Sequence, residues 1–171
     1  MINPMIKKLY ITQILVLLGG VLFSWHAVYV DFMRFYNTEE TIFKIKDCVY
    51  PNPIITPCFY GAIVFLIALI WAGYVYRDTI FSSRAKKQQK LWLILLAGTA
   101  FGWVNFSFSF LKFYMAPVGE QVTCSGVPTD NPFLTPCFWG SVVYLIAFLL
   151  SWVIMKKDKG ERETAMPTSA N

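Results

Sequence analysis

Four cysteines are the residues of this chain whose chemistry is easiest to specify, and two of them share one sequence context. Cys58 lies in Asn-Pro-Ile-Ile-Thr-Pro-Cys-Phe-Tyr-Gly, and Cys137 lies in Asn-Pro-Phe-Leu-Thr-Pro-Cys-Phe-Trp-Gly. Cys48 and Cys124 precede them by 10 and 13 residues. Threonine is a preferred N-cap and proline a preferred first helical residue. We therefore expect a helix to begin at each Thr-Pro, with the cysteine in its first turn.

This arrangement supports two kinds of chemistry. Structural disulfides within each loop, Cys48–Cys58 and Cys124–Cys137, would each stabilise the fold by about 3 kcal/mol in the chain-entropy model. Four cysteines allow three connectivities, and we favour the within-loop pattern because a duplicated segment would carry its own bridge. The alternative is thiol–disulfide exchange, because the start of a helix favours the thiolate of Cys58 or Cys137.

The gross plan resembles the DsbB family of quinone-linked, disulfide-forming membrane proteins. These are small four-helix proteins with both termini in the cytoplasm and a cysteine pair in each of two outer loops. The resemblance implies exchange between cysteine pairs with a quinone as cofactor. It lies in topology, because the Cys-x-x-Cys of that family is absent here and the two loops of this chain match each other.

We expect no metal site. All-cysteine zinc sites group their ligands in pairs about two to four residues apart, and this chain has no such pair. A single histidine excludes bis-histidine haem ligation by one chain. The quinone of the exchange hypothesis is the one cofactor we consider.

Polar residues within the apolar runs form a second group of candidates, because an ionisable side chain inside a membrane span usually has a function. His26, Asp31 and Arg34 occur in the first run, and Asn105 and Lys112 occur in the third. Asp31 and Arg34 are three residues apart, so they can pair along one helix. His26 is a candidate for ligand or proton handling, against the alternative of a packing histidine.

Aromatic residues are dense in the same two runs, around Trp25 and Trp103. They could line a groove for a quinone, an isoprenoid or another flat lipid. Alternatively, they pack the bundle or face lipid.

Four apolar runs must position these residues. The chain is 56% hydrophobic and 15% charged, whereas soluble domains are about a quarter charged. A bilayer is crossed by about 20 apolar residues in a helix. We expect an all-α membrane protein, a four-transmembrane-helix bundle with spans at about residues 9–36, 57–76, 91–115 and 136–155.

The two halves of the chain resemble each other. Leu15–Gly20 aligns with Leu93–Gly98, and Phe32–Tyr36 aligns with Phe110–Tyr114. We interpret residues 1–90 and 91–155 as tandem copies of one helical hairpin, related in parallel by an axis along the membrane normal. Residues 77–90 would be the basic loop that ends the first copy, and residues 156–171 a disordered tail.

Lysine and arginine gather before the first span, between the second and third, and after the fourth. The positive-inside rule therefore places both termini in the cytoplasm and the cysteine-bearing loops outside, where disulfides persist. We expect an integral protein of the plasma membrane. The formal charge of +5 is a topology signal rather than a sign of nucleic-acid binding.

Our leading functional hypothesis is a non-catalytic membrane module that binds a partner protein or a lipid-like ligand through its outer loops or its aromatic groove. The alternative is a DsbB-like thiol–disulfide oxidoreductase that uses the outer cysteine pairs and a quinone. A third hypothesis is a subunit of a small homo-oligomeric channel or transporter, because four helices with few polar residues make a poor pore alone.

Overall fold

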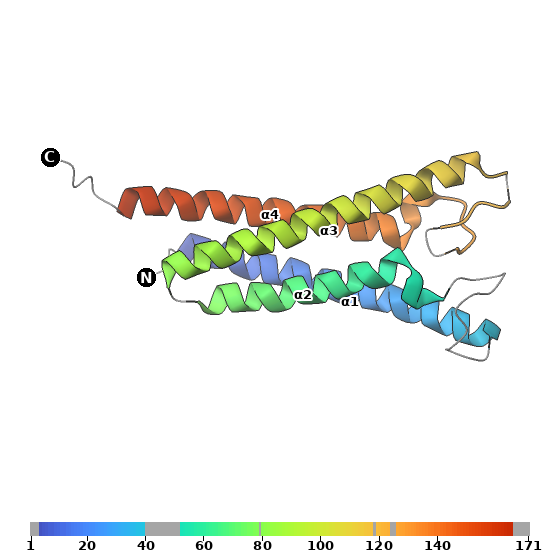
Figure 1. The fold of residues 1–171 in the computed structure, drawn as a ribbon, viewed down its shortest axis with the longest axis horizontal. Helices are drawn as coiled ribbons and strands as arrows, with labels where there is room; N and C mark the ends of the chain where they lie inside the picture. Colours follow the sequence, from blue (N-terminus) through green and yellow to red (C-terminus); the bar gives the residue numbers. More distant parts are fainter. Residues whose placement is uncertain (1–3, 40–51, 79, 118, 124–125, 166–171) are drawn as a thin grey trace.

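The computed structural model describes residues 4–39, 52–78, 80–117, 119–123 and 126–165. These residues contain four long helices (Figure 1), namely α1 (Pro4–Glu39), α2 (Pro57–Arg77), α3 (Phe81–Met115) and α4 (Pro136–Ala165). Two short 3₁₀ turns, η1 (Pro53–Ile55) and η2 (Pro132–Leu134), precede α2 and α4. All four helices are long and apolar enough to cross a membrane. The prediction of an all-helical fold with four helices long and apolar enough to cross a membrane is confirmed for the described residues.

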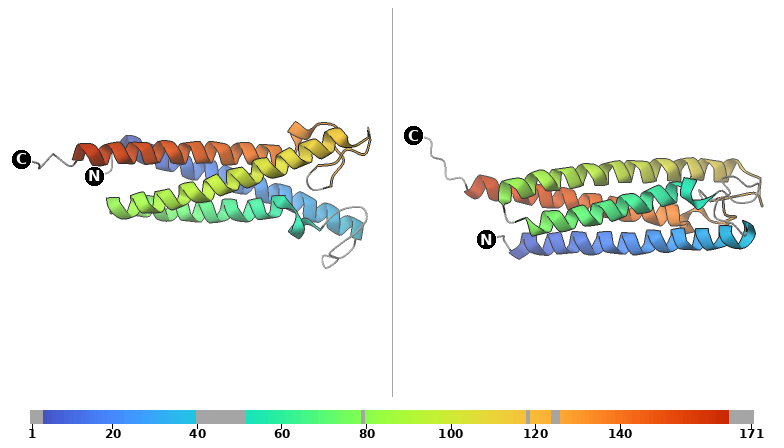
Figure 2. Two further views of the ribbon diagram at one scale, coloured as in Figure 1. Left: turned by 45° about the horizontal axis from the view of Figure 1, so that its top comes forward. Right: turned by 60° about the horizontal axis from the view of Figure 1, so that its bottom comes forward.

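The four helices run along the same axis, and successive helices point in opposite directions (Figures 1 and 2). Both chain termini and the α2–α3 connection lie at one end of the bundle, which we call the terminal end; the opposite end is the loop end. The 21 residues of α2 extend about 32 Å at 1.5 Å per residue, close to the thickness of a bilayer core. At the loop end, α1 and α3 continue past the starts of α2 and α4 (Figure 1).

The centre of the bundle is packed with apolar side chains. Leu17, Phe65, Ala68, Leu95 and Ala147 come from all four helices and are fully buried. Many large apolar side chains are exposed instead, among them Leu15, Leu22, Ile67, Ile70, Leu93 and Leu149. Exposure of so many apolar side chains is expected where lipid, rather than water, surrounds the helices.

Helix α3 begins ten residues before the predicted start of the third span. Most of the expected basic loop at residues 77–90 is helical, and only residues 78–80 connect α2 to α3. Asp78 stabilises this connection, because its carboxylate accepts hydrogen bonds from the Ile80 amide at 3.0 Å and from the Ser83 hydroxyl at 2.6 Å. Residues 81–90 contain no glycine or proline that would interrupt a helix.

Helix α4 continues about ten residues past the predicted end of the fourth span. The prediction that the tail is disordered from residue 156 is therefore wrong as far as Ala165, and residues 166–171 lie outside the described part of the chain. Asp158 explains the continuation, since its buried carboxylate accepts a hydrogen bond from the Tyr10 hydroxyl at 2.6 Å. A contact with α1 thus holds this part of α4 in the bundle.

Candidate functional site

Two turns with nearly the same hydrogen bonds position Cys58 and Cys137. The carboxamide oxygen of Asn52 accepts from the Ile54 amide at 3.0 Å, and that of Asn131 accepts from the Phe133 amide at 2.9 Å. The hydroxyls of Thr56 and Thr135 donate to the carbonyls of Pro53 and Pro132, each at 2.7 Å. Each turn thus fixes the backbone directly before the helix that carries the cysteine.

The predicted helix starts are confirmed, because α2 begins at Pro57 and α4 at Pro136. The predicted role of the threonines as side-chain caps holds only in part. Thr135 accepts a long bond of 3.4 Å from the Phe138 amide. Thr56 makes no such capping bond.

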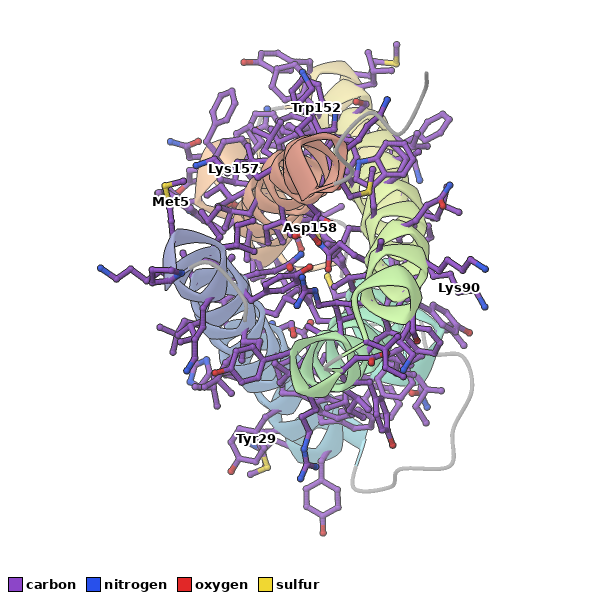
Figure 3. The ribbon with its side chains drawn as sticks, turned by 90° about the vertical axis from the view of Figure 1, so that its left-hand side faces the viewer. Met5, Tyr29, Lys90, Trp152, Lys157 and Asp158 are labelled. Atoms are coloured by element: carbon purple, nitrogen blue, oxygen red, sulfur yellow. The ribbon has the colours of Figure 1, made fainter. Side chains whose placement is uncertain are left out.

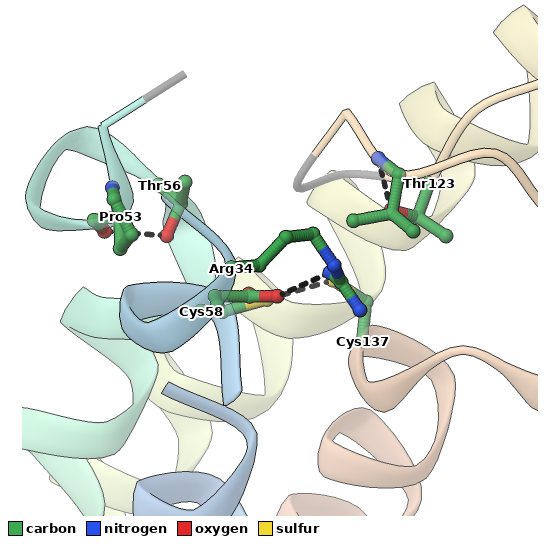
Figure 4. Close-up of polar contacts among 8 residues, drawn as sticks. Arg34, Pro53, Thr56, Cys58, Thr123 and Cys137 are labelled. Carbon is green, nitrogen blue, oxygen red and sulfur yellow. Dashed lines mark hydrogen bonds and ion pairs between the residues drawn. The ribbon is translucent and has the colours of Figure 1, made fainter. Parts of the chain in front are cut away.

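The two turns bring Cys58 and Cys137 together across the bundle (Figure 4). Their sulfur atoms are 3.1 Å apart, whereas bonded sulfurs are separated by about 2.05 Å. The pair is therefore in contact and not bonded to each other. Cys137 is disulfide-bonded, and its partner is not Cys58. The other two candidate cysteines, Cys48 and Cys124, lie outside the described residues, so the predicted pairing within each loop remains a prediction.

A cavity lies beside the two sulfur atoms, in the middle of the four helices. It offers about 60 Å³ to the centre of a water-sized sphere. An engineered cavity of about 150 Å³ takes up benzene, so only the edge of an aromatic or quinone ring fits without rearrangement. Phe23 and Phe101 line the cavity and are exposed on α1 and α3. Side chains that face lipid therefore border the cavity on two sides.

The lining residues fall into eight pairs at corresponding positions of the two hairpins. Pairs from α1 and α3 are 78 residues apart and pairs from α2 and α4 are 79 apart: Phe23 and Phe101, Ser24 and Gly102, Ala27 and Asn105, Pro57 and Pro136, Cys58 and Cys137, Gly61 and Gly140, Ala62 and Ser141, Phe65 and Tyr144. In three of the four unlike pairs, the polar member belongs to the second hairpin. The cavity is thus apolar beside one hairpin and more polar beside the other.

Candidate residues of α1 lie around this site without entering the cavity. Asp31 and Arg34 form the expected ion pair at 3.1 Å. Trp25 contacts the edge of Phe59, the residue after Cys58. His26 is exposed and does not line the cavity.

Candidate residues of α3 behave differently from one another. Asn105 lines the cavity, and its amide group donates to the Phe101 carbonyl at 2.8 Å. Trp103 contacts the rings of Phe106 and Phe138 and packs the bundle. Lys112 is exposed near the loop end. Among the described residues, no group of three or more histidine, cysteine or acidic side chains could hold a metal ion.

A second group of polar residues, which sequence reasoning missed, lies buried at the terminal end. Asp158 accepts from Tyr10 and lies 3.8 Å from the Arg84 guanidinium. The Gln88 amide group donates to Ser151 at 2.9 Å and to Gln13 at 3.3 Å. We call Tyr10, Gln13, Arg84, Gln88, Ser151 and Asp158 the terminal polar cluster.

A spacing signal for the terminal polar cluster was present in the sequence. Each of the helices α1, α3 and α4 contributes two members, at a spacing that places both on one face of the helix. The pairs are Tyr10 and Gln13, three residues apart, Arg84 and Gln88, four apart, and Ser151 and Asp158, seven apart. The expectation that Arg84 is a loop residue is wrong, because its side chain is only 2% exposed. The positive charge counted there as a topology signal is buried beside a carboxylate.

Comparison of the chain with protein-family models, with curated proteins and with solved structures finds no match. Function must therefore be argued from the site.

Proposed function

We propose that this protein is a membrane thiol–disulfide oxidoreductase whose reactive groups are Cys58 and Cys137. The observation that carries the proposal is the distance of 3.1 Å between their sulfur atoms. An approach of about 1 Å would bring them to bonding distance. Both cysteines lie in the first turn of a helix, Cys58 in α2 and Cys137 in α4.

Cys137 is disulfide-bonded in the structure, so the oxidising step starts after that disulfide has been reduced. A bond then forms between the Cys58 and Cys137 sulfurs, and the two thiols release two electrons and two protons. A quinone is the oxidant by chemical class, since it accepts both electrons and both protons and leaves as a quinol. The apolar cavity beside the sulfurs supports this assignment. Its size admits the edge of the ring that carries a carbonyl, while the rest of the ring would lie towards the lipid.

The disulfide then passes outward by two exchange reactions. A thiolate of a reduced dithiol attacks one sulfur of the Cys58–Cys137 bond and displaces the other cysteine as a thiolate. The second thiol of the dithiol attacks the mixed disulfide and releases the remaining cysteine. The dithiol is now a disulfide, and both cysteines are reduced again. By sequence, Cys48 and Cys124 are the candidates for relaying this exchange to a partner protein.

The proposal includes a tandem duplication and a cytoplasmic terminal end. The duplication is supported by the two similar turns and by the eight pairs of lining residues. The orientation is supported by lysines at the terminal end, among them Lys7, Lys86, Lys90 and Lys157. The cavity is more polar beside the second hairpin, where Asn105, Ser141 and Tyr144 line it. This difference in polarity would make the two cysteines chemically unequal, as a relay requires.

A second candidate function is non-catalytic binding of a lipid-like ligand, which the same cavity supports. One experiment separates the two. The full chain in lipid nanodiscs is reduced, incubated with decylubiquinone, blocked and digested without reductant. An oxidoreductase yields a Cys58–Cys137 linked peptide and one quinol per link, and Cys58→Ser abolishes both. If no link forms while the circular dichroism spectrum stays helical, the oxidoreductase is excluded and the binding module is favoured.

A further inference from the structure

The two cysteines at the starts of α2 and α4 differ in their bonding. Cys137 is disulfide-bonded, whereas Cys58 is a thiol. The Cys58 sulfur lies 3.1 Å from the Cys137 sulfur, about 1 Å beyond the length of a disulfide bond. Thiol–disulfide exchange begins with the attack of a thiolate on one sulfur of a disulfide. The two residues are thus placed as the attacking group and the attacked group of such a reaction.

The contact is held by hydrogen bonds on both sides. The Thr56 hydroxyl donates to the Pro53 carbonyl directly before α2, and the Ser141 hydroxyl donates to the Cys137 carbonyl at 2.8 Å within α4. Figure 4 shows the two cysteines side by side, each on its own helix. A reaction between groups that already lie in contact avoids most of the entropy cost of bringing them together. Exchange within the chain should therefore be faster than exchange with a thiol from solution.

Buried side chains separate the sulfur pair from the terminal end. Figure 3 looks along the bundle from that end and shows Asp158 pointing into the space between the helices. Asp158 is buried, and the buried rings of Phe65 and Tyr144 lie between it and the sulfurs. A water-soluble reagent therefore approaches the pair from the loop end, where α2 and α4 begin.

We propose that Cys58 exchanges with the disulfide of Cys137, so that Cys137 alternates between two partners. The Cys58 thiolate attacks the Cys137 sulfur, and a Cys58–Cys137 bond forms as the bond between Cys137 and its present partner breaks. That partner leaves as a thiolate and takes up the proton that Cys58 gave up. One disulfide and one thiol are present before and after, so the step needs no oxidant. By sequence, Cys48 and Cys124 are the candidates for the partner.

The exchange gives the two cysteines of the pair different roles. Its place in the relay rests on the proposed function: the Cys58–Cys137 bond is the one that the quinone would make. The bond between Cys137 and its partner is the one that would pass the oxidation outward. Cys137 is common to both bonds, and Cys58 takes part in the first alone. The structure therefore corresponds to the state after the outward transfer.

The test uses the full chain, purified in nanodiscs without a reductant and without a quinone. A membrane-impermeant maleimide is added, samples are digested at intervals without reduction, and the linked and labelled peptides are identified by mass spectrometry. We expect a Cys58–Cys137 link to accumulate while the former partner of Cys137 acquires an equal amount of label, because the maleimide traps each thiol that the exchange releases. If Cys137 keeps its partner while the circular dichroism spectrum stays helical, the proposal is overturned.

Two variants assign the exchange to the contact between the sulfurs. Cys58→Ala should leave the disulfide of Cys137 in place and its partner unlabelled. In a chain with Cys58→Ser and Tyr60→Cys, the thiol moves two residues to an exposed position, and the partner should again stay unlabelled. Equal labelling of the partner in the native chain and in either variant would show that the disulfide opens without Cys58, and would overturn the proposal.

Quinol formation, measured separately with decylubiquinone, distinguishes the exchange from the proposed function. Exchange without quinol formation supports the alternation of Cys137 and excludes the oxidoreductase. Quinol formation without exchange supports the oxidoreductase and overturns the alternation of Cys137.

Discussion

The ring of Phe65 lies almost flat against the ring of Tyr144, with centroids 3.7 Å apart and planes inclined by 23°. The two residues hold corresponding positions in α2 and α4, each seven residues after the cysteine of its helix. The Tyr144 hydroxyl donates to the Gly61 carbonyl at 2.7 Å. The stack therefore joins the two hairpins and closes the central cavity two helical turns from the sulfur atoms.

A glycine behind each ring makes the stack possible. A β-carbon at Gly20 would lie 2.6 Å from Phe65, and one at Gly98 would lie 2.5 Å from Tyr144. We expect Gly20→Ala and Gly98→Ala each to destabilise the protein by about 1–3 kcal/mol, the usual cost of overpacking. Gly19→Ala is the control, because a β-carbon there meets nothing within 4 Å. Thermal unfolding in nanodiscs measures all three, and equal midpoints for Gly19→Ala and Gly20→Ala would contradict the packing argument.

The contact between the two sulfurs predicts a specific cross-link. In a chain with Cys48→Ser and Cys124→Ser, mild oxidation should join Cys58 to Cys137 and increase mobility on a non-reducing gel. A second chain moves one cysteine by two residues, with Cys58→Ser and Tyr60→Cys, onto an exposed position. It should not form the link. Equal cross-linking of both chains would indicate a mobile loop end rather than a preformed pair.

Much of the loop-end site follows from sequence patterns. Thr-Pro before an apolar run specifies where α2 and α4 begin. Because each of these helices follows an antiparallel partner in its hairpin, both begin at the loop end, and Cys58 and Cys137 lie there together. Their contact with each other was not predicted. It depends on how the two hairpins pack, which a pattern within one helix does not encode.

The terminal end was predicted less well, because charged residues there were expected to be exposed to solvent. Arg84 and Asp158 were assigned to a loop and a tail, yet both are buried. Their partners lie in other helices, up to 148 residues away. Only tertiary packing identifies a charged residue as half of a buried pair.

The connection between α2 and α3 predicts a loss of stability in acid. Hydrogen bonds from Lys87, from Ser83 and from the Ile80 amide lower the pKa of Asp78 to about 2, from an ordinary value of about 3.9. A lowered pKa means that the charged carboxylate stabilises the fold above about pH 4 and that this contribution is lost as the pH falls towards 2. The unfolding midpoint of the native chain should therefore exceed that of Asp78→Asn at pH 6, and the difference should vanish near pH 2. A difference that does not change with pH would contradict this role.

Arg84 and Asp158 should be strongly coupled in stability. The two side chains are 2% and 4% exposed, and removing one partner of a buried ion pair typically costs about 3–5 kcal/mol because the other charge is left in the interior. We expect this loss for Arg84→Met and for Asp158→Leu alone, and a much smaller loss for the double variant, in which neither charge remains.

The control for this coupling is the ion pair between Lys87 and Asp78. Lys87 lies in α3, as Arg84 does, but its side chain is 40% exposed. Solvent screens such a pair, so Lys87→Met should change the unfolding midpoint far less than Arg84→Met. Unfolding in nanodiscs of the two single variants, the double variant and the control completes the cycle. If the single losses simply add in the double variant, Arg84 and Asp158 are not coupled, and their ion pair does not hold α3 against α4.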